Sequence, residues 1–214
     1  MSAEEPILLD LFCGAGGAAM GYHRAGFKRI IGVDNKPQPN YPFEFILADA
    51  MTFPLKGFDL IHASPPCQKF SALNAIYPQN KRRHPDLLTP TRRRLQESGQ
   101  FYVIENVPGS PLAATFMLCG SMFGLRLGDT YLRRHRPFES NIMILAPGCI
   151  HQGAAVGVFG HGEHWRPNGK RMSLPADEAR AIMEMPWSGR DGLSQAIPPA
   201  YTEYIGKAAL EALS

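Results

Sequence analysis

The sequence predicts an α/β fold built on a doubly wound, largely parallel β-sheet. Three observations carry this prediction. Short apolar runs alternate with helix-compatible stretches over the first half of the chain, a glycine-rich turn follows the first run, and polar residues stand where the runs end. Because sheets of this kind place ligands at the carboxyl ends of their strands, we expect the functional residues there.

The same pattern gives the individual elements. Strands are expected at 7–12, 29–33, 45–48, 59–63 and 100–104, and helices at 18–25, 86–98, 176–185 and 201–213. Pro65 and Pro66 must end the fourth strand, because proline lacks the N–H that a sheet needs. Residues 69–85 lack periodicity and should form a long loop. After Asn106 the pattern becomes irregular, with short strands predicted at 118–125, 131–139 and 142–145.

Length and composition bound the class of protein. The 214 residues suffice for one buried domain but not for two of ordinary size. The sequence has no apolar run long enough to span a bilayer, and its first residues are acidic where a secretory signal would be basic. The 4 cysteines show no close paired spacing. We therefore expect a cytoplasmic protein with reduced cysteines, without membrane contact and, by default, monomeric.

Basic residues gather in two stretches, although the net charge is only +3. Lys81, Arg82 and Arg83 with the arginines at 92–94 form the first, and Arg126 with the arginines at 133, 134 and 136 forms the second. One interpretation is two solvated faces. Both stretches flank the polar motifs described next, which favours a phosphate-binding surface.

The glycine-rich turn holds Gly14, Gly16 and Gly17 between the first strand and the first helix. Small residues here let the backbone approach a ligand and direct helix N-terminal amides toward it. The spacing differs from the Gly-x-Gly-x-x-Gly of dinucleotide binders, so a nicotinamide enzyme is disfavoured. Asp34, at the end of the second strand, is positioned to accept hydrogen bonds from ribose hydroxyls. A surface turn is its alternative role.

A thiol and a carboxyl group follow two other strands. Cys67 stands in a Pro-Pro-Cys-Gln turn after the fourth strand, and Glu105 and Asn106 end the fifth. A lone cysteine is usually a small buried hydrophobe. At the mouth of a crevice, a lowered thiol pKa would suit a nucleophile, and a nearby carboxyl group suggests acid catalysis coupled to its attack.

Together these motifs resemble the cytosine-5 DNA methyltransferases. The resemblance rests, in order, on Asp10-Leu11-Phe12-Cys13-Gly14-Ala15-Gly16-Gly17, Pro65-Pro66-Cys67-Gln68, Glu105-Asn106-Val107, Arg134-His135-Arg136 and Gln195-Ala196-Ile197-Pro198-Pro199-Ala200-Tyr201. It implies the Rossmann-like sheet of the class I S-adenosylmethionine-dependent methyltransferases. The catalytic domain would comprise residues 1–139 and 174–214, with a reduced target-recognition insertion at 140–173.

The resemblance also implies a reaction. S-adenosyl-L-methionine would donate a methyl group to carbon 5 of a cytosine flipped out of double-stranded DNA. Cys67 would attack carbon 6, while Glu105 protonates or hydrogen-bonds N3. Arg134 and Arg136 would bind the base carbonyl and a phosphate and steady Glu105.

Two sets of binding residues complete what the resemblance implies. The cofactor set is Phe12, Gly14, Gly16, Gly17, Asp34, Asn35, Asp49, Ala50, Pro65, Ser194 and Gln195. The substrate set is Gln68, Ser71, Asn106, Lys81, Arg82, Arg83, Arg166 and Asn168. In the first set, Phe12 would pack on the adenine, Asp34 would hold the ribose and Asp49 the adenine amine.

The chain departs from the family pattern in places. Leu132 stands where the family usually has Gln, and Ser194 where it usually has Asn, which would change cofactor affinity or admit a larger sulfonium donor. The short insertion predicts a recognition sequence of about two to four base pairs, because each specific pair typically needs a bidentate side chain. Compact versions of this kind resemble enzymes encoded by bacteriophages and prophages.

The same residues also suggest other functions. Cys149, His151, His161 and His164 fit no common zinc-finger spacing, so we predict no metal site. The rival functions are an RNA cytosine-5 methyltransferase, a catalytically silent DNA-binding relative, and a thiol hydrolase that would use His62 as its base.

Overall fold

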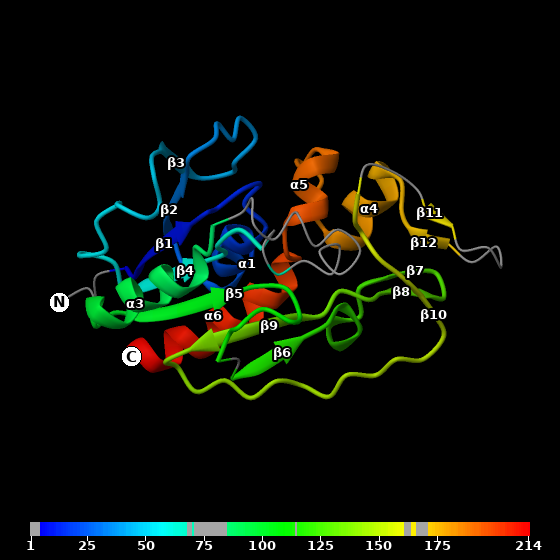
Figure 1. Cartoon of the computed structure of the whole chain (residues 1–214). Helices are drawn as coiled ribbons and strands as arrows, with labels where there is room; N and C mark the ends of the chain where they lie inside the picture. Colours follow the sequence, from blue (N-terminus) through cyan, green and yellow to red (C-terminus); the bar gives the residue numbers. More distant parts are fainter. Residues whose placement is uncertain (1–4, 68–69, 71–84, 114, 161–163, 166–170) are drawn as a thin grey trace.

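A seven-stranded sheet in the order β3-β2-β1-β4-β5-β9-β6 organises the computed structural model (Figure 1). The model describes residues 5–67, 70, 85–113, 115–160, 164–165 and 171–214. Strands β1 to β5 pair in parallel, and β9 runs antiparallel to both β5 and β6. The parallel strands therefore end at one edge, as the sequence predicts.

The elements have the following bounds. The main sheet contains β1 (Ile7–Leu11), β2 (Arg29–Asp34), β3 (Glu44–Leu47), β4 (Leu60–Ala63), β5 (Phe101–Glu105), β6 (Phe116–Leu118) and β9 (Arg136–Ser140). Two smaller sheets contain β7 (Arg126–Leu127), β8 (Thr130–Leu132) and β10 (Ala154–Val156), and β11 (His164–Trp165) with β12 (Arg171–Ser173). The helices are α1 (Gly17–Ala25), α3 (Leu88–Ser98), α4 (Ala176–Met183), α5 (Arg190–Gln195) and α6 (Pro199–Leu213), and a 3₁₀ turn, η2, covers Gly120–Phe123.

Alternate residues of the strands enter two separate cores. Leu8 of β1 belongs to the core that contains α1 and α6, whereas its neighbour Leu9 belongs to the core that contains α3. This follows from the two-residue period of a strand. Helices α1 and α6 touch closely, because a Cβ added to Gly21 would lie 2.1 Å from the carbonyl oxygen of Pro199. Sheet and helices thus hold the strand ends in fixed positions.

The strands and helices predicted up to 105, and the helices at 176–185 and 201–213, are confirmed within a few residues. The loop predicted at 69–85 lies outside the described residues except for 70 and 85. The irregular stretch is different. The predicted strand 118–125 is the end of β6 and then η2, and the predicted strand 131–139 divides into β8 and β9, which belong to different sheets. Residues 142–145 form no strand, although Ile142 is buried and Met143 is 89% exposed, because no neighbouring strand pairs with them. The sequence analysis also missed α5.

The region predicted as a recognition insertion is hydrogen-bonded to the rest of the fold. Strand β10 pairs in parallel with β8, and the backbone N–H of Leu174 donates to the carbonyl of Gly157. Among the described residues, no helix is both long and apolar enough to cross a lipid bilayer.

Candidate active site

The glycine turn lies between the ends of β1 and β2. The backbone N–H of Gly14 donates to Oδ2 of Asp34, 3.1 Å away. Gly14 has a φ of +48°, and a Cβ added to it would meet nothing within 4 Å. The other Asp34 oxygen accepts the N–H of Lys36 at 3.0 Å. The turn is therefore held by Asp34 and leaves open space beside Gly14.

Gly16 and Gly17 are required by packing of the protein on itself. A Cβ on Gly16 would lie 2.7 Å from Cδ of Pro42, and one on Gly17 would lie 2.3 Å from the carbonyl oxygen of Ile197. Close approach to a ligand, predicted for all three glycines, thus has an internal explanation at these two. Ile197 belongs to the last sequence motif, so this motif does return beside the first. Trp187 strengthens the contact by donating from Nε1 to the carbonyl of Ala15, 2.8 Å away.

The remaining cofactor candidates divide between the strand ends and α5. Asp49 is exposed after β3, and its Oδ1 accepts the N–H of Met51 at 2.9 Å. Arg94 of α3 stabilises this turn by donating hydrogen bonds to the carbonyls of Ala50 and Phe53, both at 2.7 Å. Phe12 has a φ of +56° and is half-buried beside the same turn. Asn35 and Gln195 are exposed, and the hydroxyl of Ser194 donates to the carbonyl of Asp191 at 2.9 Å.

The turn that carries Cys67 is tied to the end of β5. Asn106 is 1% exposed, and its Nδ2 donates to the carbonyl of Pro65 at 2.9 Å, while its Oδ1 accepts the N–H of Val107 at 3.0 Å. Asn106 therefore positions the cysteine turn, because both polar ends of its side chain bind the protein, and its predicted contact with substrate stays a prediction. Cys67 is half-buried and accepts the N–H of Phe70 on its carbonyl.

Glu105 and Arg136 form an ion pair beside Cys67. Nε of Arg136 lies 2.8 Å from Oε1 of Glu105, and Glu105 is 7% exposed. Burial raises the pKa of Glu105 above its ordinary value, although Arg136, Arg134 and a hydrogen bond with Ser64 oppose the shift. The site thus favours a protonated Glu105 more than water does, which suits a proton donor.

The expected lowering of the Cys67 pKa is wrong for the free protein. Burial raises the pKa of the Cys67 thiol, and the negative charge of Glu105 raises it further, against the smaller opposing effects of Arg136 and Arg134. The proline-rich turn gives no sign of this, because the burial of the thiol depends on residues packed around the turn.

His62 belongs to a chain of polar groups that the sequence analysis did not find. It is completely buried, with Nδ1 3.1 Å from the Tyr22 hydroxyl and Nε2 3.0 Å from Oγ of Ser64. Burial lowers the pKa of His62 to about 3, so its ring is neutral. Ser64 in turn bonds Glu105. His62 therefore supports Glu105, and a hydrolase that uses it as the base for Cys67 is disfavoured.

Arg134 joins three parts of the chain. It is 6% exposed, with Nη1 2.6 Å from the carbonyl of Val158, and Nη2 2.8 and 2.5 Å from the carbonyls of Ser194 and Ala196. The Tyr201 hydroxyl donates to the carbonyl of Arg134. Both Nη atoms thus have a structural role, whereas the buried Nε has no hydrogen-bond partner among the described residues. The predicted contact of Arg134 with the base stays a prediction.

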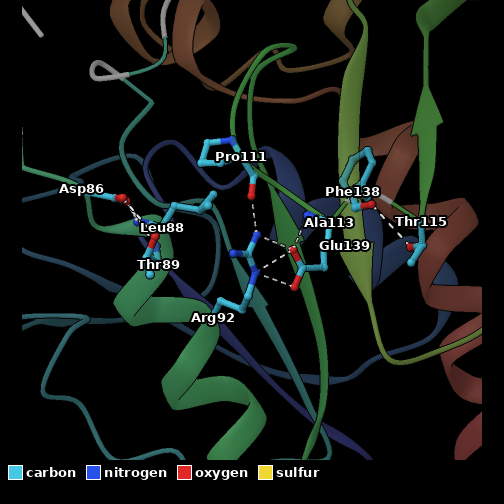
Figure 2. Close-up of polar contacts among 9 residues, drawn as sticks. All are labelled: Asp86, Leu88, Thr89, Arg92, Pro111, Ala113, Thr115, Phe138 and Glu139. Atoms are coloured by element: carbon cyan, nitrogen blue, oxygen red, sulfur yellow. Dashed lines mark hydrogen bonds and ion pairs between the residues drawn. The ribbon is translucent and has the colours of Figure 1, made fainter.

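Two of the three arginines at 92–94, for which a phosphate-binding surface is predicted, bind acceptors within the protein. Figure 2 shows Arg92 bound to both carboxylate oxygens of Glu139, at 2.7 to 2.9 Å, and to the carbonyl of Pro111. Arg94 holds the turn at 50–53, as described above, and exposed Arg93 pairs with Glu97 one turn along α3. Burial of Glu139 explains why α3 carries Arg92, since a buried carboxylate needs a partner.

A cavity of about 910 Å³ lies next to Arg136, among the described residues. Its lining runs from exposed Arg133 to Arg136, along residues 153–159, and to Glu178 and Ser194. Cys67, Glu105 and Gly14 do not line it, so this cavity is separate from the cysteine turn and the glycine turn. The predicted site residues Gln68, Ser71, Lys81, Arg82, Arg83, Arg166 and Asn168 lie outside the described residues.

The fold and site define a class I methyltransferase architecture, with a mostly parallel seven-stranded sheet and polar residues at its strand ends. Residues 7–110 match the model of the C-5 cytosine-specific DNA methylases. This segment, just under half of the chain, is therefore similar to the C-5 cytosine-specific DNA methylases.

Individual relatives agree with this similarity. The chain is 31% identical over 124 residues to the type II methyltransferase M.AquIA of Picosynechococcus sp., covering 49% of this chain and 50% of that protein. It is 29% identical over 119 residues to the type II methyltransferase M1.HphI of Haemophilus parahaemolyticus, covering 46% and 32%. The matched part thus spans half or less of these relatives. A candidate DNA modification methyltransferase encoded within an E. coli prophage shares the fold, with a TM-score of 0.62, 15% identity and coverage of 97% and 99%.

Proposed function

We propose that this protein transfers a methyl group from S-adenosyl-L-methionine to carbon 5 of cytosine in double-stranded DNA, with Cys67 as the nucleophile. The observation that carries the proposal is the convergence of Cys67, Glu105 and Arg136 at the ends of β4, β5 and β9. The match of residues 7–110 to the C-5 cytosine-specific DNA methylases supports the choice of base and of carbon 5.

The strand ends fit the cofactor on grounds independent of the family. Space beside Gly14, an oriented Asp34 and an exposed Asp49 lie after three adjacent strands. Gly14 would border the amino-acid portion, Asp34 the ribose and Asp49 the adenine amine. When bound, the cofactor supplies an electrophilic sulfonium methyl group.

The side chains around Cys67 would then act in sequence. The Cys67 thiol would release its proton to water, and the thiolate would attack carbon 6, which forms the C–S bond and moves an electron pair toward carbon 5. Glu105 gives its proton to N3, which stabilises the resulting enamine, and Arg136 balances the carboxylate that remains. Carbon 5 would take the methyl group and lose its proton to a proton acceptor, and the C6–S bond would break to release Cys67. The cytosine ring would regain its aromaticity, and Glu105 would regain the N3 proton.

DNA would approach from the side of Arg133 and Arg136. Arg133 is exposed and lines the 910 Å³ cavity with the glycine-rich segment 153–157. A flipped nucleotide must leave the helix to reach Cys67, and cationic groups at this rim would hold its phosphates.

A methyl-transfer assay with two substrates tests the proposal. Purified protein is incubated with methyl-labelled cofactor and either duplex DNA or transfer RNA, and the nucleosides are identified after digestion. We expect 5-methyldeoxycytidine from DNA and no label in RNA. Label in RNA alone would instead support the rival RNA methyltransferase, and label on another base would overturn the assignment of carbon 5.

A further inference from the structure

The fold gathers four metal-ligating side chains that are scattered along the sequence. They are Cys119, which follows β6; His135, which directly precedes β9; and Cys149 and His151, on the segment that leads to β10. One ligand atom of each lies within 4.8 Å of the corresponding atom of every other. We propose that these residues form a structural zinc site, the Cys119–His151 site.

Distances between the ligand atoms match a tetrahedral ion. With Zn–S near 2.3 Å and Zn–N near 2.0 Å, neighbouring sulfur and nitrogen ligands lie about 3.5 Å apart. Sγ of Cys149 lies 3.5 Å from Nε2 of His135, and Sγ of Cys119 lies 3.6 Å from Nε2 of His151. A third pair, Cys149 Sγ and His151 Nε2, is closer at 2.6 Å, and an ion would open this edge by about 1 Å. Both exposed side chains have room for that change.

Surrounding groups orient the ligands. The ring of Tyr131 stacks on His151, with centroids 5.7 Å apart and planes at 6°. Oγ of Ser121 lies 3.4 Å from Sγ of Cys149, so it can donate a hydrogen bond to the thiolate. Such contacts fix ring orientation and stabilise ligand charge in metal sites. The cluster is therefore arranged beyond the four ligands themselves.

Charge and ligand chemistry select zinc. The two negative charges of two thiolates balance the charge of a divalent cation, and the imidazoles are neutral. The fully buried Cys119 can therefore bind as a thiolate without leaving a net charge inside the protein. Thiolate and imidazole are the donors that zinc prefers, and four protein ligands leave no open position. The site is thus structural, not catalytic.

The position of the site explains what it would stabilise. Figure 1 shows the segment from β9 to β10 crossing the length of the molecule without a helix or strand of its own. A zinc ion would attach its end, at Cys149 and His151, to the turn after β6 and to the backbone between Arg134 and Arg136. Closing such a long connection by a metal limits the freedom of the unfolded chain and holds the start of the predicted recognition region.

This inference replaces the expectation of no metal. In the sequence, Cys149 and His151 suggest a zinc site only together with His161 and His164, whose side chains lie outside the described residues. Cys119 and His135 come from elsewhere in the chain, and only the turn after β6 and the approach to β9 bring them together. No spacing rule predicts that set.

Metal content of the full-length protein tests the site. The protein is expressed with added zinc, purified without chelator, and assayed for zinc and total protein. We expect one zinc per chain, and a loss of at least tenfold in Cys149→Ser and His151→Ala, which change exposed ligands and should still fold. Cys67→Ser and His23→Ala are matched controls that should keep full zinc. Zinc absent from the wild type, or retained equally by all four variants, would overturn the proposal.

Cobalt substitution gives an independent readout of geometry. Metal-free protein, prepared with chelator and reductant, is titrated with Co²⁺ and its visible absorption recorded. We expect the intense bands of tetrahedral thiolate-bound cobalt at one equivalent in the wild type and the His23→Ala control, and not in Cys149→Ser. Absence of the bands in the wild type, or a disulfide between Cys119 and Cys149 in the protein as purified, would contradict a zinc site.

Discussion

Cys67 and Glu105 each change the ionisation of the other. The carboxylate raises the pKa of the thiol, so a thiolate forms more readily once Glu105 holds a proton. A hydrogen bond from protonated Glu105 to N3 of a bound cytosine would keep that proton on Glu105. The residue that would activate the ring would thereby also favour the nucleophile.

This coupling predicts how a substitution changes the reactivity of Cys67. Glu105→Gln removes the negative charge, so the Cys67 pKa should fall and alkylation by iodoacetamide should reach its half-maximal rate at lower pH. Mass spectrometry of the Cys67 peptide across a pH series measures the shift. Glu97→Gln, which changes an exposed carboxylate on α3, should leave the profile unchanged. A profile that moved to higher pH in Glu105→Gln would contradict the coupling.

Asp10 is a second buried acid whose ionisation affects stability. Burial raises its pKa from 3.8 to about 8, against a hydrogen bond from Tyr41 at 3.2 Å, and its Oδ1 has no partner among the described residues. The folded protein therefore holds a proton that the unfolded chain releases above pH 3.8. Its contribution to stability is complete below that pH and is lost as the pH rises to about 8.

Asp10→Asn should accordingly stabilise the protein in alkaline solution. Asparagine keeps the oxygen that accepts from Tyr41 and has no proton to lose, so we expect a gain of about 1–3 kcal/mol at pH 8.5 relative to pH 5. Thermal unfolding of both proteins at the two pH values, without cofactor, measures the difference. An equal difference at both pH values would indicate that ionisation of Asp10 plays no part.

At the level of the elements, the two clusters of arginines behave differently. Arg92 and Arg94 on α3 bind internal acceptors, whereas Arg133 lies at the rim of the 910 Å³ cavity. Both clusters look alike in sequence because a list of charges does not reveal acceptors. The acceptors of Arg92 and Arg94 are Glu139 and the carbonyls at 50 and 53. These residues are far from α3 in the sequence.

Arg133 should therefore contribute to DNA affinity and Arg93 should not. We expect Arg133→Gln to weaken binding of duplex DNA to a similar extent for all sequences and to reduce the slope of log affinity against log salt by about one. Arg93→Gln removes the same charge from an exposed position on α3 and is the matched control. Fluorescence anisotropy at several salt concentrations measures both. Equal slopes in the two variants would remove Arg133 from the DNA surface.

Elements that depend on local pattern were predictable, and those that depend on partners were not. The short apolar runs of β1 and β4 and the glycine turn predict the sheet and the place of Gly14 and Cys67. Residues 142–145 are also an apolar run, yet they pair with no described strand, and η2 follows from the left-handed Gly124 and the packing of Gly120 on Leu132. Asn106 and Arg134 lie where the motifs place them, but only the fold shows that their polar groups bind the protein.

For the molecule as a whole, the small size of the predicted recognition region would limit specificity. The segment after β9 uses part of its length to form β10 and to contact Arg134 through Val158. Few residues then remain to read base edges, each good bidentate contact adding about 1–3 kcal/mol. The account therefore predicts methylation at a short and frequent sequence.

Bisulfite sequencing of a plasmid modified by this protein measures that specificity. We expect methylated cytosines within a motif of about two to four base pairs. Methylation confined to a site of six or more specified pairs would show that recognition comes from a partner or from the region after Cys67.

Covalent trapping tests the central claim most directly. A duplex oligonucleotide with 5-fluorocytosine cannot lose its substituent at carbon 5, so an enzyme that attacks carbon 6 remains bound after methyl transfer. With S-adenosyl-L-methionine present, we expect a denaturation-resistant adduct whose tryptic peptide contains Cys67, and none with Cys67→Ser. An adduct on Cys13, Cys119 or Cys149, or one that persists in Cys67→Ser, would contradict the assignment of the nucleophile.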